Sequence, residues 1–412
     1  MAIDLYVIIV SEHNLAELRA CLYLQPTTIL MVSSHKMQAA AQRLLGVLQK
    51  QLPHTKVEVL TSTTDTPFSG DYLQENQQWL ERIFLPKLAQ IKPSSAQLNM
   101  TGGTKILAYL LTRIYPWQEI HYQPLADTIP LERFYTQNDS PHLLPTIDLA
   151  TAATSDISPD NHALLYMDYV RPHSPNIIRK HPDSLAIALL RLETQQANNP
   201  HQGLGAFIAL FEQAWSLPTQ EPFVNMPIPP NTHLDESLLA RLNNLYIGSH
   251  AAPLTRTPEG LQIPAAHHKK YTDWRKWISG DWYEQLIEQW LLDYGIDKKH
   301  LLSNVQLSNK TDPQGQESDT LLQYKNKLYV IEIKADVPQS KQLGDMENQL
   351  SSLAMQLGKV ENVLILSPAI RRRYAPEQWL RFELRCRNKN VKLCVADTQS
   401  SFINQFFYSS KP

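Results

Sequence analysis

The 412-residue sequence predicts a mixed α/β protein with more than one domain. Strand-like apolar segments alternate with helix-like segments over the first third of the chain, and a second such series begins near Trp277. Between them, the proline-rich segment LPTQEPFVNMPIPPN interrupts regular structure. A chain of this length is long enough for two or three cores, so we expect domains over residues 1–150, 151–275 and 276–412.

The first domain is expected to be a doubly wound sheet, because its strands are separated by helices and must therefore pair in parallel. The expected strands are 4–10, 27–34, 56–62 and 96–100, the expected helices are 14–24, 36–52, 76–91 and 104–114, and a closing hairpin is expected from 119–125 and 131–136.

The sequence pattern of secondary structure is weak in the middle region and clear in the last region. The middle region is expected to be a helical or winged connector, with helices at 184–196, 204–217 and 235–246 and a hairpin at 253–264. The last region is expected to be a second α/β domain, with helices at 280–295, 340–358 and 371–387 and strands at 304–308, 318–325, 327–335, 362–368 and 391–397.

The composition is that of a globular protein without a strong overall charge. Hydrophobic residues make up 43% and charged residues 19%, and the formal net charge is −2. No global field therefore attracts nucleic acid, so any nucleic-acid surface must be local. Three cysteines without metal-site spacing indicate a reduced compartment. No secretory signal and no apolar run of ~20 residues is found, so we expect a cytoplasmic protein with no membrane segment.

Acidic residues and a lysine gather in the expected strands of the last domain. Glu332 and Lys334 lie on one face of their strand, which taken alone is usually a solvated face. Asp319 begins the preceding strand of the same hairpin, whose turn is expected near Lys325-Asn326, and Glu284 lies on the helix upstream.

Carboxylates from adjacent strands can hold Mg²⁺ or Mn²⁺, which would acidify a water and neutralise charge on a scissile phosphate. Lys334 would then position that water or stabilise the transition state. An acid followed one hairpin later by Glu-x-Lys and a helix is the PD-(D/E)xK nuclease pattern, although Ser318-Asp319 replaces the usual Pro-Asp. A structural salt-bridge network is the alternative.

The segment TGGTK, from Thr101 to Lys105, joins an expected strand to an expected helix. Glycines permit a ligand to approach the backbone closely, and a helix N-terminus offers unpaired N–H groups and a positive dipole end. This combination suits an anion such as phosphate. Neither GxGxxG nor the P-loop spacing is present, so a nucleotide-hydrolysing site lacks support, and a bare tight turn is the alternative.

The place of TGGTK in the sheet supports a ligand site, because crevices at the C-terminal ends of parallel strands bind ligands. Polar clusters follow two other strands and are expected to line the same rim. The rim residues are Ser11, Glu12, His13, Asn14, Ser33, Ser34, His35, Lys36, Asn99, Thr101, Gly102, Gly103, Thr104 and Lys105.

These motifs together resemble the CRISPR ancillary nucleases of the Card/Can type. The first domain carries NMTGGTK, and the last carries GDWYEQL, QESDTLL and LYVIEIKA. Such proteins join a CRISPR-associated Rossmann fold (CARF) sensor to a PD-(D/E)xK nuclease. The resemblance implies a Rossmann-like CARF domain at 1–150 and a restriction-endonuclease-like α/β nuclease domain at 276–412, and it covers the middle region only as a connector.

The resemblance also implies an activity. A cyclic oligoadenylate, usually cyclic tetra-adenylate made by a type III CRISPR complex, would bind across the two CARF domains of a homodimer. Binding would switch on Mg²⁺- or Mn²⁺-dependent cleavage or nicking of DNA or RNA in antiviral defence. Glu284, Asp319, Glu332 and Lys334 match the family's catalytic positions, and the three acids among them would hold the metal.

Other residues match the family less closely. Glu317 matches an accompanying acid without an assigned role, and Gln349 is a weaker candidate on the following helix. Two basic segments could contact nucleic acid. HHKKYTDWRKW, which starts at His267, could grip a backbone and stack on bases, or its tryptophans could anchor the core. The arginines at 371–373, 381, 385 and 387 could form a basic rim.

Three other functions remain open or are set aside. A CARF-controlled nucleic-acid-binding regulator with an inert nuclease fold is the main alternative, although the intact Asp319, Glu332 and Lys334 set speaks against it. A stand-alone restriction-type endonuclease would cut without a messenger. A HEPN-type ribonuclease needs an Arg-x₄₋₆-His motif, which the sequence lacks.

Overall fold

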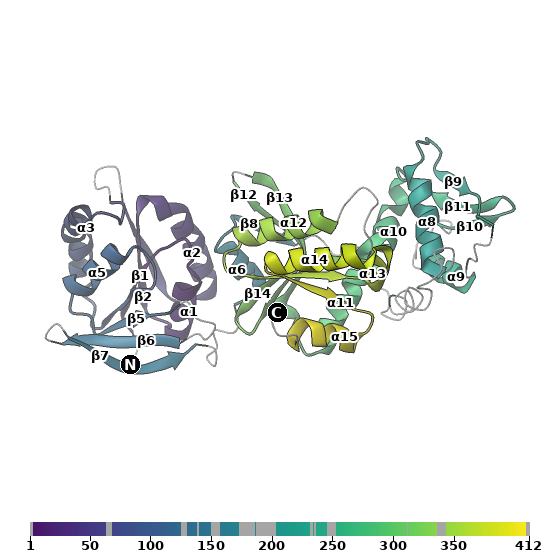
Figure 1. Cartoon of the computed structure of the whole chain (residues 1–412). Helices are drawn as coiled ribbons and strands as arrows, with labels where there is room; N and C mark the ends of the chain where they lie inside the picture. Colours follow the sequence, from purple (N-terminus) through teal and green to yellow (C-terminus); the bar gives the residue numbers. More distant parts are fainter. Residues whose placement is uncertain are drawn as a thin grey trace.

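The computed structural model describes residues 3–62, 68–124, 130–137, 140–149, 157–172, 186, 203–230, 234, 236–244, 253–310, 312–335 and 343–408. In this part of the chain the strands form sheets of seven, three and six members. Figure 1 shows one unit around each sheet, with the six-stranded sheet between the other two. The α/β class expected from the sequence is confirmed.

The seven-stranded sheet is doubly wound, with the strand order β3-β2-β1-β4-β5-β6-β7. Its five parallel strands are β1 (Leu5–Ile9), β2 (Thr28–Ser33), β3 (Lys56–Thr61), β4 (Ala96–Asn99) and β5 (Glu119–Tyr122). Two antiparallel strands complete it, β6 (Pro130–Gln137) and β7 (Ser140–Asp148). The order reverses at β1, which lies between β2 and β4. This reversal is the topological switch point where ligands bind in such sheets.

β7 was not expected from the sequence, for a clear physical reason. Its residues SPHLLPTID are nearly all exposed, and Leu143 is 81% exposed. An edge strand that buries no face has no apolar alternation to reveal it. The expected hairpin of β5 and β6 is present, and β7 extends it by one strand.

Helices cover both faces of this sheet (Figure 1). They are α1 (Leu15–Leu24), α2 (Gln38–Gln51), α3 (Leu73–Trp79), the π-helix η2 (Leu80–Phe84), α4 (Leu85–Ile91) and α5 (Lys105–Ile114). One apolar cluster joins α1 and α2 to the sheet, and another joins α3, η2, α4 and α5 to its opposite face. Strands that are buried on both sides read as continuous apolar runs, as β1 and β2 do.

The six-stranded sheet has the order β16-β15-β14-β13-β12-β8. β12 (Leu301–Asn309), β13 (Asp312–Tyr324) and β14 (Lys327–Lys334) are antiparallel neighbours, while β15 (Glu361–Leu366) and β16 (Val391–Val395) run parallel to β14. Its helices are α11 (Trp282–Asp293), α12 (Leu343–Gln356), α13 (Pro368–Arg373), α14 (Pro376–Asn388) and α15 (Gln399–Ile403). The turn between β13 and β14 lies at Lys325-Asn326, as expected.

The middle region contributes to two units. α6 (Pro159–Leu164) and β8 (Tyr169–Pro172) join the six-stranded sheet, where β8 pairs with β12. The three-stranded sheet holds β9 (Phe223–Met226), β10 (Thr255–Thr257) and β11 (Gly260–Pro264), with α8 (Gly203–Ser216), α9 (Glu236–Asn244) and α10 (Thr272–Lys276) around it. The expected hairpin at 253–264 is confirmed. The expected helix at 184–196 lies outside the described residues except Ala186, and the domain boundaries stay predictions.

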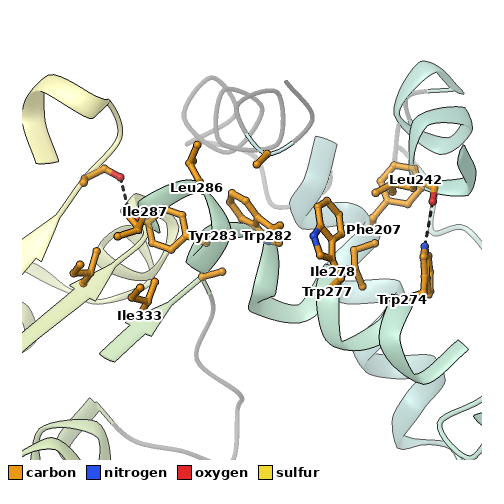
Figure 2. Packing of buried hydrophobic residues seen from close by; sticks show 14 of the residues in the cluster. Phe207, Leu242, Trp274, Trp277, Ile278, Trp282, Tyr283, Leu286, Ile287 and Ile333 are labelled. Atoms are coloured by element: carbon orange, nitrogen blue, oxygen red, sulfur yellow. Dashed lines mark hydrogen bonds between the residues drawn. The ribbon is translucent and has the colours of Figure 1, made fainter. Parts of the chain in front are cut away.

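The unit of the three-stranded sheet and the unit of the six-stranded sheet, below called the nuclease-like unit after the resemblance above, share one apolar core. Figure 2 shows this core running from Phe207 and Leu242 through Trp274 and Trp282 to Ile333 of the six-stranded sheet. All five side chains are at most 2% exposed. Since continuous burial opposes relative movement, these two units are expected to move together. No helix in the described ranges is both long and apolar enough to span a bilayer.

The first glycine of TGGTK packs against β1. A Cβ atom on Gly102 would overlap the main-chain oxygen of Ile9 and would lie 2.7 Å from Glu17 Oε1. Gly103 has a φ of +76° and would also collide with Ile9. Packing and backbone conformation therefore require both glycines, independently of any ligand.

Glu17 lies beneath this loop on α1 and is fully buried. Neither of its carboxyl oxygens has a hydrogen-bond partner among the described residues. Burial raises the pKa of Glu17 to about 8 from an ordinary value of 4.5, since the ionised form loses its hydration. The group is therefore mostly protonated at neutral pH.

Substitution Gly102→Ala should destabilise the protein by about 1–3 kcal/mol, the usual cost of overpacking. Urea unfolding measures the effect. Gly46→Ala is the matched control, because Gly46 lies within α2 with no atom within 4 Å of an added Cβ. The control should gain about 0.5–1 kcal/mol from helix propensity. Equal stability of the two variants would contradict the packing.

Substitution Glu17→Gln should change how stability depends on pH. The raised folded-state pKa means that the contribution of Glu17 is fully present below about pH 4.5 and is lost as pH rises through about 8. Relative to the wild type, the variant should therefore gain roughly 1 kcal/mol per pH unit across this window. Denaturant unfolding at a series of pH values tests this, and parallel profiles would show that Glu17 is not buried as described.

Candidate functional site

The predicted acids and lysine of the hairpin β13–β14 lie together. Asp319 Oδ2 accepts hydrogen bonds from the Ile333 N–H at 2.7 Å and from Lys334 Nζ at 2.9 Å. Lys334 Nζ also lies 2.7 Å from Glu332 Oε1. The Glu332 and Asp319 side chains are 7% and 12% exposed. The hairpin thus holds one ammonium between two carboxylates.

Charge balance keeps Lys334 protonated. Burial by itself would lower the pKa of Lys334, but the adjacent carboxylates of Asp319 and Glu332 outweigh burial and raise that pKa above its ordinary value. A partly buried amine that stays charged is a fixed source of positive potential. It can stabilise negative charge that develops on a phosphate.

Glu284 approaches the same group from helix α11. The preceding residue, Tyr283, is fully buried, and its hydroxyl donates to the main-chain oxygens of Leu366 at 3.2 Å and Ala396 at 3.0 Å. These bonds fix α11 against the sheet. Burial, and then the negative charges of Asp319 and Asp281, raise the pKa of Glu284 well above its ordinary value.

A small polar cavity lies between Glu284 and Asp319. Its volume is about 10 Å³, which is close to the space that one water molecule needs. The residues that line it are Asp281, Glu284, Gln285, Glu288, Ser303, Asn304, Asp319 and Thr320. Glu332 and Lys334 are linked to this cavity through Asp319 and do not line it themselves.

Asp281 and Glu288 were not among the residues predicted from the sequence. Both lie near Glu284 at helical spacings of three and four residues, a pattern that places side chains on one face. That spacing was the available signal. Glu317 is exposed and pairs in register with Gln306, and Gln349 is exposed on α12. Neither of these two lesser candidates lines the cavity.

The acidic group has the chemistry of a metal site without its close geometry. Within the described ranges, no three His, Cys, Asp or Glu side chains gather closely enough to hold a metal ion. The chemistry of the donors does fit a hard cation, because the carboxylates of Asp319 and Asp281 oppose ionisation of Glu284 and a positive charge would relieve that opposition. In this arrangement Lys334 supplies the positive charge for two of the carboxylates.

A larger cavity lies at the switch point of the seven-stranded sheet. Its volume is about 240 Å³. The lining residues are Val10, Ser11, Glu12, Ser34, Lys36, Met37, Ser69, Gly70, Asp71, Gly103, Thr104 and Leu107. They follow β1, β2, β3 and β4, so the predicted meeting of polar clusters at one rim is present. Of the predicted residues, Ser11, Glu12, Ser34, Lys36, Gly103 and Thr104 line it.

Several predicted rim residues support the loops without lining the cavity. Asn14 Oδ1 accepts the Ser11 N–H and Asn14 Nδ2 donates to the Ser11 main-chain oxygen, both at 2.8 Å. Asn99 Oδ1 accepts the Thr101 N–H at 2.9 Å, and Thr101 Oγ1 accepts the Gln123 N–H at 2.9 Å. These bonds hold the loops that follow β1 and β4 in place.

The remaining predicted residues lie elsewhere. Ser33 is fully buried, and its hydroxyl donates to the main-chain oxygen of Ser34 at 3.1 Å. His13 packs its ring 5.8 Å from the ring of Tyr166. Lys105 is exposed in the first turn of α5, outside the cavity lining. Gly102 faces β1, as described above.

The loop after β3 was missed. It contributes Ser69, Gly70 and Asp71, and Asp71 Oδ2 lies 3.1 Å from Lys36 Nζ. The Thr104 hydroxyl donates to the main-chain oxygen of Gly70, which joins this loop to TGGTK. The signal was the position of the loop, since β3 ends at the same edge as the other parallel strands.

The two basic segments combine buried aromatic side chains with exposed basic ones, and contact with nucleic acid stays a prediction. Trp274 and Trp277 are buried, and the Trp274 indole N–H donates to the Leu242 main-chain oxygen at 3.1 Å (Figure 2). The tryptophans thus anchor the core, while Lys269 and Lys270 are exposed. Arg371, Arg381 and Arg387 are also exposed, whereas Arg385 Nε lies 3.2 Å from Glu347 Oε1.

Comparisons with known proteins agree with this architecture. No protein-family model and no curated protein matches the chain. The solved structure of Can2 from Sulfobacillus thermosulfidooxidans in complex with cyclic tetra-adenylate aligns with a TM-score of 0.63 and 18% identity over 98% of both chains. Protein VC1899 from Vibrio cholerae aligns with a TM-score of 0.65 and 16% identity over 97% of this chain and 96% of its own. The resemblance to Card/Can-type proteins is therefore confirmed at the level of the fold.

Proposed function

We propose that this protein is a nuclease activated by a cyclic oligoadenylate. One observation carries the proposal: a chain with the fold of Can2, which was solved with cyclic tetra-adenylate, holds a polar cavity at one switch point and a carboxylate–lysine cluster on a separate sheet. The first site suits an anionic ligand and the second suits phosphodiester hydrolysis. We assign it to type III CRISPR antiviral defence in the cytoplasm, with DNA or RNA as the substrate.

The sensor cavity offers the groups that a ring of phosphates and adenines needs. Lys36, which pairs with Asp71 in this structure, would turn its positive charge to a phosphate, Ser11 and Ser34 supply hydroxyls, and the backbone at Gly103 is open to close approach. Exposed apolar side chains flank the cavity on α3 and α5, which pack against each other. They are Tyr72, Leu73, Ile106 and Tyr109. We propose that a second copy covers this surface, so that two cavities share one messenger in a homodimer.

The nuclease site would act through its fixed charges. Lys334 holds a positive charge beside the scissile phosphate and stabilises the charge that builds up during attack by water. Asp319 orients Lys334 and the backbone of β14. Mg²⁺ or Mn²⁺ would supply an acidified water and neutralise phosphate charge, held by Glu284, Asp319 and Glu332 after these acids move closer together than they lie in this structure.

Substitutions Asp319→Asn and Lys334→Met should each reduce messenger-stimulated cleavage by about 100-fold or more, the scale for losing one preorganised charge. Labelled single-stranded DNA, RNA and supercoiled plasmid, each with Mg²⁺ or Mn²⁺, measure this. Asp293→Asn is the control, because Asp293 is exposed on α11. Its hydrogen-bond partner within the described ranges is Gln289 on the same helix. Messenger binding without cleavage by the wild type on any substrate would favour the regulator alternative.

Substitution Lys36→Ala should weaken binding of cyclic tetra-adenylate by about tenfold, since a charge-assisted hydrogen bond contributes ~1.5–3 kcal/mol. Calorimetric titration measures both the affinity and the stoichiometry, which should be one messenger per two chains. Lys56→Ala is the control, because Lys56 is similarly exposed and likewise pairs with an acid, Glu58 on β3, but lies outside the cavity. Equal affinities for the two variants would remove Lys36 from the site.

A further inference from the structure

Arg19 reaches from the sensor unit into the nuclease-like unit. It lies on α1, and its Nη2 donates to the main-chain oxygen of Asn326. The side chain is 6% exposed, and its Nε has no hydrogen-bond partner in the described part of the chain. Burying a guanidinium with unsatisfied donors costs free energy. Helix α1 could pack against its own sheet without burying this guanidinium.

The acceptor lies at the tip of the catalytic hairpin. Lys325 and Asn326 form its two-residue turn, with φ of +46° and +63°, which is the tight form that matches the twist of paired strands. One strand that leaves this turn carries Asp319 and the other carries Lys334. A hairpin held this tightly moves as one piece, so a shift at its tip changes the position of both groups relative to α11.

The other end of α1 is tied to the sensor cavity. The paired bonds between Asn14 and Ser11 join the helix start to a lining residue. One turn further along, Glu17 Oε1 lies 2.7 Å from the position of a Cβ on Gly102, directly beneath the TGGTK loop. Two of the four loops that line the cavity therefore rest on α1. A ligand that moves either loop acts on this helix.

Neighbouring contacts also hold the two units together, and one of them reaches β13 without involving α1, because His162 Nδ1 of α6 lies 3.1 Å from Gln323 Oε1. Tyr166 lies between His13 of the sensor, at a ring distance of 5.8 Å, and Gly358 at the end of α12. Arg43 of α2 donates from Nε to the Leu165 main-chain oxygen at 3.1 Å. These contacts fasten the segment after α6 to the sensor.

We infer that Arg19 is a positioning residue that transmits occupancy of the sensor cavity to Asp319 and Lys334 through the Asn326 turn. This inference rests on the proposed function. Loop movement at the cavity displaces α1, the Arg19 guanidinium carries that displacement to the turn, and the hairpin moves relative to Glu284. Arg19 touches neither messenger nor substrate. Its removal should therefore uncouple the two sites and leave each intact.

The test uses the full-length protein with the substitution Arg19→Met, which keeps the apolar stem and removes the donors. Cyclic tetra-adenylate should bind with unchanged affinity, KM for nucleic acid should be unchanged, and stimulation of kcat should fall by about tenfold or more, since coupling between sites is typically ~5- to 150-fold. Arg19→Lys keeps one donor and should restore part of the stimulation. Stimulation equal to that of the wild type, with binding intact, would overturn the inference.

Two controls separate coupling from simple loss of contact. Asn326→Gly keeps both the positive φ and the main-chain acceptor, so it should be stimulated as the wild type is. Arg43→Met removes a second arginine from the same junction but leaves the hairpin contact in place, and it should also retain stimulation. Loss of stimulation in Arg43→Met to the same extent as in Arg19→Met would show a general docking role and overturn the assignment.

Hydrogen exchange provides a readout that does not depend on cleavage. In the wild type, cyclic tetra-adenylate should change the exchange of the β13–β14 hairpin amides, and in Arg19→Met it should not. If Arg19→Met does not fold, Arg19→Lys replaces it, and the change in hairpin exchange on messenger binding should then be smaller than in the wild type. A wild type that binds messenger and changes hairpin exchange without cutting any substrate would contradict the proposed nuclease while supporting the coupling. A hairpin that never responds to bound messenger would contradict the coupling alone.

Discussion

The antiparallel pairing of β13 with β14 is the interaction on which the rest of this structure depends. The register opposes Thr320 to Ile331, which brings Asp319 on one strand within 2.9 Å of Lys334 on the other. The same pairing ends in the turn that accepts the hydrogen bond from Arg19. One hairpin therefore holds the proposed nuclease site at one end and the contact with the proposed sensor unit at the other.

Three wholly or partly buried ionisable side chains differ in how their charge is compensated. Lys334 is paired with two carboxylates and keeps its charge. Glu284 faces other acids and has a raised pKa, while Glu17 has no partner in the described ranges and is protonated at neutral pH. The first arrangement is compensated, and the other two store unfavourable free energy that a cation or a change in packing would release. Both uncompensated acids lie at a proposed functional site or directly beneath one.

The sensor loops show how structural and binding roles divide within one motif. In TGGTK, Gly102 is required by the main chain of β1, Thr101 supports Gln123, and Thr104 both begins α5 and joins the loop after β3. Only the segment at Gly103 and Thr104 opens to the cavity. The glycines that first indicated a phosphate site are thus explained in part by packing, and the position of the loop carries more weight than its composition.

The local sequence pattern was enough to predict the helices and strands that bury one or both faces. The parallel strands β1 and β2, the alternation of Glu332 with Ile333, and the turn at Lys325-Asn326 all follow from apolar runs, period-two spacing and turn chemistry. β7 and β8 could not be recognised, because a short or exposed edge strand buries too little to impose a pattern on its residues.

The sequence patterns could not predict which residues that are distant along the chain come into contact. The approach of Asp281 to Asp319, of Asp71 to Lys36 and of Arg19 to Asn326 depends on how helices and loops pack on their sheets. Sequence patterns report the surroundings of a residue along its own element. Contacts between residues far apart in the sequence form only when the whole chain has folded. Here they determine the geometry of both proposed sites and of the contact between them.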